Sequence, residues 1–227
     1  MAEPQDDRWY FHWLAMARRH PSALLLLVQL ACVLLYPLAE GMRAARMLLG
    51  AFGVVILLLA LRMIRYTSVR VWPAVCLAVL AVAMNGLYLE GGFDGLRPWQ
   101  AAVEAVFYFY AAGRLIAYML ADRRATTDEL FAAGATFTLL VWAFTYVLML
   151  CQALQPAAFA GPSGAARGWS ELMFLSFALM SSTGIGDVTP LTGMAKAVAD
   201  LEMMAGVMYL ALVVSRLIGL AVAQQKR

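Results

Sequence analysis

The residues of this chain whose types suggest the most specific chemistry form one short polar segment, residues 181–190, with the sequence SSTGIGDVTP. The segment lies between two strongly apolar stretches, so it is predicted to enter a membrane without crossing it. Backbone polar groups inside a bilayer must find partners within the protein, so a non-helical segment at that depth is stable only where it lines a water-filled path or a bound ion. The first functional hypothesis is therefore ion conduction.

The residue types of this segment suit the binding of a dehydrated cation. Gly184 and Gly186 can adopt positive φ at little steric cost, which lets successive carbonyl groups turn toward one axis. Four such segments around an axis would surround a cation with rings of oxygen atoms. Ser182 adds a hydroxyl group at the inner end of the segment, and Asp187 places a carboxylate at the outer mouth, where it attracts cations.

Residues 182–187, Ser-Thr-Gly-Ile-Gly-Asp, resemble the selectivity filter of the potassium-channel pore family, usually written Thr-Val-Gly-Tyr-Gly-Asp. We call residues 182–187 the filter segment. The resemblance implies K⁺ binding at Ser182, Thr183, Gly184 and Ile185. Thr183 and Ile185 stand where the family has an apolar residue and an aromatic one, so the supports behind the carbonyl groups are expected to differ.

The sequence around the filter segment has the order of that family's pore domain, and the resemblance covers residues 130–223. Residues 169–180 have the length of a pore helix, and residues 191–223 are long enough to span an ~30 Å hydrocarbon core. Gly206 lies where the inner helix of many members carries a flexible glycine, which implies a gating hinge. Glu202 and Gly206 together resemble the Glu-x-x-x-Gly of bacterial members. Glu202 is expected to accept hydrogen bonds behind the pore helix, and the less favoured alternative is that it lines the pore.

Composition predicts an all-α membrane protein. Apolar residues make up 63% of the chain and charged residues 14%, against about 45–50% and about 25% in soluble domains. Apolar runs predict six transmembrane helices, with a re-entrant pore helix and filter loop between the fifth and the sixth. The predicted spans are residues 22–39, 45–64, 71–90, 99–121, 130–153 and 191–222.

The expected domain order is an interfacial amphipathic segment (1–21), a four-helix peripheral domain (22–121), a linker (122–129) and a pore domain (130–227). The alternative that the first apolar run is a cleaved signal peptide is less favoured, because the run is long and lacks an Ala-x-Ala exit. Lys and Arg are more frequent on the side of the two termini, which places both termini in the cytoplasm and Asp187 outside, in a multi-pass protein of the cell inner membrane.

The fourth predicted span carries too little charge to sense voltage strongly. It holds only Arg114 and the opposing Glu104, whereas each elementary charge that crosses the membrane field contributes only ~2.3 kcal/mol per 100 mV. Arg114 is therefore either a structural ion pair or polar contact within the bundle, or a remnant sensor or ligand contact. Because the chain ends shortly after the sixth span, no cytoplasmic ligand-binding domain is expected.

The sixth span also predicts an intracellular constriction. Counted by helical turns from Gly206, one broad face carries apolar side chains that could line the pore and close it by expelling water. These residues are Leu210, Val214, Ile218 and Val222. The methionines of the same span, Met194, Met203, Met204 and Met208, are interpreted as filling gaps in a core.

Other functions find little support in the sequence. No nucleophile is paired with a base and no phosphate-binding loop is present, so an enzyme, a cofactor other than K⁺ as permeant ion and a nucleic-acid partner are not expected. The favoured hypothesis is a homotetrameric potassium channel in a lipid bilayer. The alternatives are a non-selective cation channel and a transport-type protein with a filter-like ion-binding loop, although transporters normally carry internal repeats and none is visible.

Overall fold

The computed structural model describes residues 21–39, 56, 59, 72–91, 94–121, 127–160 and 166–225. The described chain is mostly helical, as the apolar runs predict. Its elements in order are α2 (Pro21–Ala39), α4 (Trp72–Gly91), the 3-10 helix η1 (Asp94–Leu96), α5 (Arg97–Ala121), α6 (Thr127–Leu154), β1 (Phe159–Ala160), α7 (Trp169–Met180), β2 (Thr189–Pro190) and α8 (Gly193–Gln225).

Among the described residues, three helices are long and apolar enough to cross a membrane: Arg97–Leu120, Thr127–Leu154 and Gly193–Arg216. They correspond to the fourth, fifth and sixth predicted spans. The apolar helices α2 and α4 lie at the first and third predicted spans. Apart from residues 56 and 59, the second predicted span lies outside the described residues. So does the interfacial segment, apart from Pro21, and so do linker residues 122–126.

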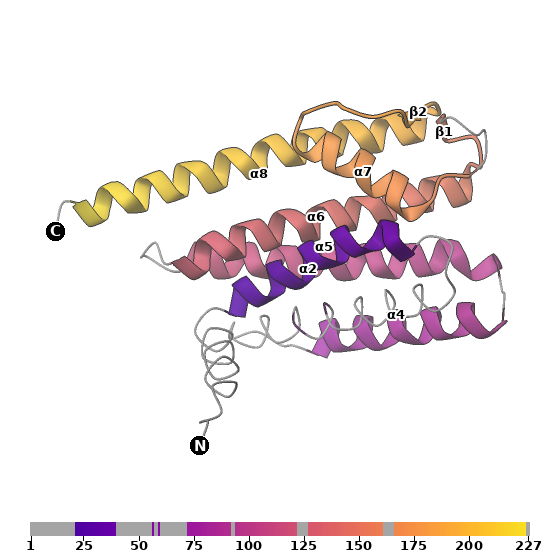
Figure 1. The fold of residues 1–227 in the computed structure, drawn as a ribbon, viewed down its shortest axis with the longest axis horizontal. Coiled ribbons are helices and arrows are strands. Elements are labelled where there is room, and N and C mark those ends of the chain that lie inside the picture. Colours follow the sequence, from indigo (N-terminus) through magenta and orange to yellow (C-terminus); the bar gives the residue numbers. More distant parts are fainter. Residues whose placement is uncertain are drawn as a thin grey trace, which may run out of the picture.

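The helices pack around α5 and α6, which run side by side along most of their length. Helix α2 packs on α6 and α4 packs on α5, while α7 and α8 pack against α6 and against each other. In Figure 1, α7 and α8 therefore lie on one side of the α5–α6 layer and α4 lies on the opposite side. The short segment that contains α7 and the filter segment covers only the first part of α8.

Small and aromatic residues together form the core between α5 and α6. Ala111 and Ala112 on α5 and Ala135 on α6 are fully buried, and such small side chains let helix backbones approach closely. The remaining space is filled by aromatic rings, among which Tyr108 stands edge-on to Trp142 with ring centroids 5.6 Å apart. This layer gives α7 and α8 a fixed surface on which to pack.

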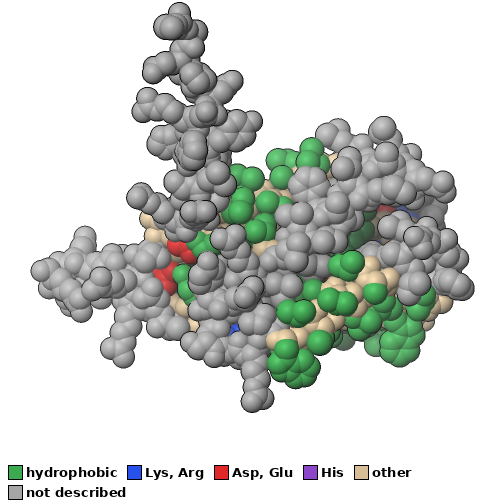
Figure 2. All heavy atoms as spheres, turned by 90° about the horizontal axis from the view of Figure 1, so that it is seen from below, with side chains coloured by type: hydrophobic (Ala, Val, Ile, Leu, Met, Phe, Trp, Pro, Cys, Tyr) green, Lys and Arg blue, Asp and Glu red, His purple; other side chains and the backbone are tan. Residues whose placement is uncertain are grey.

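Much of α8 is uncovered in the single chain. The interpretation of its methionines as core residues is wrong for this chain alone, because all four are exposed, from 39% for Met203 to 64% for Met208. The reason is that α7, α6 and β2 cover only one side of the helix. On the face drawn in Figure 2, hydrophobic side chains among the described residues are also far more extensive than charged ones.

Candidate functional site

The start of α7 is fixed by a polar cluster at the end of α6. Glu171 accepts a hydrogen bond from the backbone N–H of Gly168 at 2.7 Å and pairs with Arg167 at 3.1 Å. The backbone N–H of Arg167 donates to the side chain of Gln152 at 2.7 Å, and the amide of Gln152 donates back to the carbonyl group of Arg167 at 2.8 Å. A carboxylate at this position also suits the positive end of the helix dipole.

The end of α7 is capped by the filter segment itself. Ser182 N–H donates to the carbonyl group of Leu179 at 3.1 Å, and the N–H groups of Thr183 and Gly184 both donate to Ala178, at 3.0 and 3.2 Å. The last carbonyl groups of a helix have no partners within it. Here the chain that leaves the helix supplies those partners, so its N–H groups face α7.

This capping determines where the carbonyl groups of the filter segment point. In a planar trans peptide, the N–H of one residue and the C=O of the preceding residue point in opposite directions, and no cis peptide occurs in the described chain. The carbonyl groups of Ser181, Ser182 and Thr183 therefore point away from α7. This path of the backbone requires positive φ at Ser182 (57°) and Gly184 (67°). At Gly184 the absence of a Cβ removes the steric penalty of positive φ.

Two hydroxyl groups reinforce the cap. The Ser181 hydroxyl donates to the carbonyl group of Phe177 at 2.6 Å, and the Thr183 hydroxyl lies 3.1 Å from the Ser181 hydroxyl and 3.4 Å from the Ala178 carbonyl oxygen. The side chain of Thr183 is thus turned back toward α7. The threonine in place of an apolar residue supports the filter segment through hydrogen bonds, and Ser181 was not identified from the sequence.

The outer end of the filter segment is also held by its own chain. Strand β1 pairs antiparallel with β2, with Phe159 opposite Pro190, and the N–H of Leu191 donates to the carbonyl group of Ala158 at 2.8 Å. Within the segment, a Cβ on Gly186 would lie 3.7 Å from the ring of Phe174, which is ordinary van der Waals contact. Ile185 and Asp187 are both exposed in the single chain.

Glu202 of α8 lies behind α7. Its side chain is fully buried and its carboxyl group is hydrogen-bonded to the hydroxyl of Ser176 on α7. The same hydroxyl lies 2.8 Å from the carbonyl oxygen of Val141 on α6. One serine therefore joins three helices. The sequence signal that could have identified it is a polar residue within the apolar run that follows Glu171.

Gly206 lies one turn beyond Glu202, where α8 passes the end of α7. A Cβ on Gly206 would lie 2.8 Å from the carbonyl carbon of Met180 and 2.9 Å from its Cα, nearer than real Cβ atoms approach other atoms. The close approach of two backbones is a reason for glycine that the sequence does not reveal, because Gly206 and Met180 belong to different helices. The hinge role of Gly206 stays a prediction.

Glu202 is the first of three polar residues on α8 that are spaced seven apart and so share one face. The hydroxyl of Tyr209 donates to the carbonyl group of Ala133 on α6 at 2.6 Å, and Arg216 pairs with Glu129 on α6 at 3.2 Å. We call Glu202, Tyr209 and Arg216 the α8 polar row. It holds α8 against α7 near the filter segment and against α6 farther along.

The structure thus brings the filter segment, Glu202 and Gly206 together around the end of α7. The residues predicted to line the constriction lie farther along α8 and are exposed in the single chain. Their exposed fractions are 41% for Leu210, 52% for Val214, 59% for Ile218 and 46% for Val222.

Residues 134–223 match a family model described as an ion channel. The matched segment is shorter than half of the chain and runs from the first part of α6, through α7 and the filter segment, to the last part of α8. With its apolar helices, this similarity supports an ion channel in a membrane. No curated protein and no solved structure matches the chain.

Proposed function

We propose that four copies of this chain form a potassium-selective channel across the cell inner membrane, with both termini in the cytoplasm. The observation that carries the proposal is the capping of α7 by the N–H groups of Ser182, Thr183 and Gly184. It directs carbonyl groups away from α7, into space that one chain leaves open. Rings of carbonyl oxygens that replace the hydration shell of K⁺ need four such segments.

In this arrangement the backbone oxygens of Ser182, Thr183, Gly184 and Ile185 bind K⁺. The helix α7 points its C-terminal end toward the same region, and the negative end of a helix dipole favours a cation. Asp187 is exposed at the outer end of the segment, where its carboxylate raises the local concentration of cations.

The uncovered side of α8 supports assembly from several copies. Large apolar side chains of this helix, among them Met204 at 63%, Met208 at 64% and Ile218 at 59%, are exposed in the single chain. In a tetramer the face with Ile218 lines the axis, and other faces contact neighbouring copies and lipid. The helices α2, α4 and α5 then surround the pore domain.

A non-selective cation channel is the second candidate, and Ile185 is the observation that favours it. Ile185 is 67% exposed and carries no hydroxyl group that could bond to surrounding pore helices. A filter segment with fewer lateral supports can change its width more easily, which weakens discrimination by cavity size but leaves discrimination by the number of carbonyl ligands.

The test is a flux measurement on purified protein in liposomes, first with a K⁺ gradient and then with a Na⁺ gradient, followed by reversal potentials under mixed-ion conditions. We expect K⁺ to be preferred. Equal permeability would favour the non-selective channel, and absence of flux from a correctly assembled protein would leave the transport-type alternative. Gly184→Ala should abolish flux. Gly113→Ala is the matched control, because a Cβ on Gly113 in α5 meets nothing within 4 Å.

Native mass spectrometry in mild detergent tests the assembly separately. We expect a tetramer as the main species. A stable monomer or dimer as the only species would refute the tetramer, because one or two filter segments cannot close a ring around an ion.

A further inference from the structure

The first turn of α6 carries two consecutive acidic residues that are both buried, Asp128 at 8% and Glu129 at 2% exposure. Consecutive residues of an α-helix point about 100° apart, so the two carboxylates face different neighbours. Buried acidic side chains are rare unless they are paired. Two of them side by side therefore indicate that this turn is built to hold more than one partner.

Asp128 holds the peripheral helices. One carboxylate oxygen accepts the backbone N–H of Ser22 at 3.2 Å and the other accepts the Ser22 hydroxyl at 2.8 Å. Ser22 lies in the first turn of α2, where an anion is favoured by the helix dipole and by the unpaired N–H groups. The hydroxyl of Tyr118 on α5 lies 3.5 Å from the same carboxylate. The start of α6 is thus joined to both α2 and α5.

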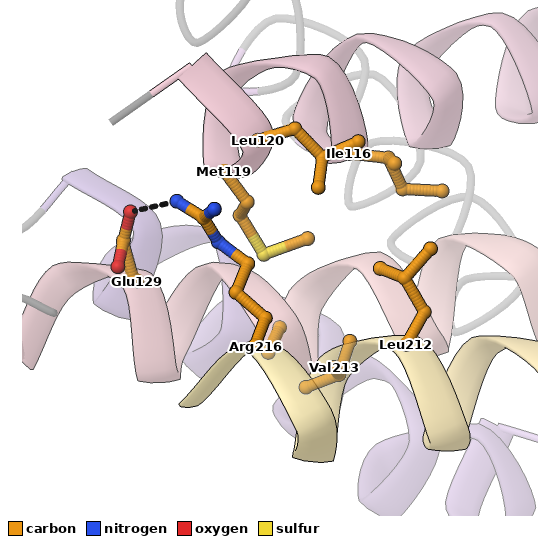
Figure 3. Close-up of a pocket in the computed structure, with 8 residues that line it drawn as sticks. Ile116, Met119, Leu120, Glu129, Leu212, Val213 and Arg216 are labelled. Atoms are coloured by element: carbon orange, nitrogen blue, oxygen red, sulfur yellow. Dashed lines mark hydrogen bonds and ion pairs between the residues drawn. The ribbon is translucent and has the colours of Figure 1, made fainter. Parts of the chain in front are cut away.

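Glu129 holds the inner helix. It pairs with Arg216, the last residue of the α8 polar row, at 3.2 Å. In Figure 3 this ion pair stands at one end of an apolar pocket in which Met119 and Leu120 of α5 face Leu212 of α8. Three helices therefore meet at the pair, at the end of α8 remote from the filter segment.

The position of the pair relates it to the predicted constriction. Arg216 lies between Val214 and Ile218 in the sequence, but its side chain is turned toward α6 and is 19% exposed, whereas Val214 and Ile218 are exposed. Removing the cationic partner of a buried acid strongly destabilises the folded state, because the remaining charge is buried without compensation. The pair therefore holds this turn of α8 against α6. Without it, apolar faces from several copies are free to associate at the axis.

We propose that Asp128 and Glu129 couple the peripheral helices to the inner helix. α2 and α5 set the position of the first turn of α6 through Asp128, and Glu129 transmits that position to α8 through Arg216. The pair is a positioning contact that keeps the constriction open, so its loss lowers flux. The expected change in flux rests on the proposed function. The contact between the helices does not depend on it.

The first experiment is a set of flux measurements on variants of the full chain. Arg216→Gln and Glu129→Gln should each lower K⁺ flux by about fivefold or more, within the range usual for coupled sites, and Arg216→Lys should retain most of it. Ser215→Ala is the control, because the Ser215 hydroxyl donates to the carbonyl group of Leu212 in its own helix at 3.0 Å. Unchanged or raised flux in Arg216→Gln would overturn the proposal.

The coupling itself is tested by combining Asp128→Asn with Arg216→Gln. If Asp128 acts through the ion pair, Asp128→Asn lowers flux in the wild-type background and adds little in the Arg216→Gln background. Independent effects would multiply instead. A multiplicative loss would overturn the coupling, even if each single variant is impaired.

A second readout separates this proposal from the proposed function. Spin labels at Thr127 and Gly219, both exposed, report the distance between the start of α6 and the last part of α8. Labelled protein is diluted with unlabelled protein, so that the distance is measured within one chain. Asp128→Asn and Arg216→Gln should each lengthen or broaden that distance distribution. If the wild type conducts no ion, the proposed function fails while this measurement still decides the coupling, and an unchanged distribution in both variants overturns it.

Discussion

The close approach of Gly206 to Met180 predicts that Gly206→Ala destabilises the protein. A Cβ at this position would lie 2.8 Å from the carbonyl carbon of Met180, whereas two carbon atoms prefer a separation of about 3.5–4.0 Å. The carbonyl oxygen of Met180 lies closer still to that Cβ. Relief of the overlap therefore requires a shift of more than about 0.7 Å, the distance that takes the carbonyl carbon from 2.8 to about 3.5 Å. Both groups belong to helix backbones, so no side-chain rotation can supply that shift.

The expected magnitude follows from two opposing contributions. Overpacking in a well-packed region costs about 1–3 kcal/mol, and a backbone clash belongs at the upper end of that range. Alanine in place of a mid-helix glycine raises the free energy of unfolding by about 1 kcal/mol through its higher helix propensity. The net loss is about 1–2 kcal/mol. A glycine that serves only as a flexible hinge has no clash, so its replacement by alanine would raise stability.

The assay is the thermal unfolding midpoint of the purified protein in mild detergent, with flux measured on the same preparations. For a chain of this length about 1 kcal/mol corresponds to 2–4 °C, so Gly206→Ala should lower the midpoint by several degrees. Gly219→Ala on the same helix is the matched control, because a Cβ there meets nothing within 4 Å. Its midpoint should stay unchanged or rise.

The sign of the shift decides between the two explanations. If Gly206→Ala raises the midpoint as Gly219→Ala does, and lowers flux, then the packing argument is refuted and the hinge is supported. If it lowers the midpoint, the glycine is required by the contact with Met180. A midpoint that falls in both variants would show that the loss does not depend on the contact with Met180, and would also refute the reasoning.

Gly184→Ala should abolish flux but leave the tetramer intact in native mass spectrometry, because a φ of 67° costs an alanine about 1–2 kcal/mol at the residue that directs the carbonyl groups. Opening should depend only weakly on voltage in planar-bilayer recordings, and a steep response abolished by Arg114→Gln would contradict the charge argument. Ile218→Asn should raise resting flux, because a polar side chain keeps an apolar constriction wet; unchanged flux there and in Val214→Asn would place gating at the filter segment. Ser176→Ala should lower the unfolding free energy by about 1–3 kcal/mol, since a buried carboxyl group loses its partner, and an unchanged thermal midpoint would contradict this.

The parts of the fold that depend on local pattern could be read from the sequence. A turn-rich segment before residues 169–180 and a glycine-containing segment after them predict a short helix there. The helix α7 occupies that range. Long apolar runs likewise indicated α5, α6 and α8. The runs at residues 22–39 and 71–90 also agree within one residue with the bounds of α2 (Pro21–Ala39) and α4 (Trp72–Gly91).

The contacts that make the site could not be read in this way. Glu129 and Arg216 are 87 residues apart, and Tyr209 and Ala133 are 76 apart, so no window of the sequence contains both partners. Each of these polar residues alone is compatible with a solvated surface. Gly206 stands in a motif that the sequence shows, but its contact with Met180 depends on how two helices cross, which local pattern does not encode.

The seven-residue spacing of the α8 polar row makes the length of α8 more constrained than its composition. An inserted or deleted residue between Gly206 and Tyr209 would turn everything beyond it by about 100° and move it by about 1.5 Å along the helix axis. Tyr209 and Arg216 would then lose Ala133 and Glu129 together, and the apolar face with Ile218 would turn away from the axis of the proposed tetramer at the same time. Related chains should therefore tolerate substitutions along this stretch of α8 far better than any change in the number of its residues.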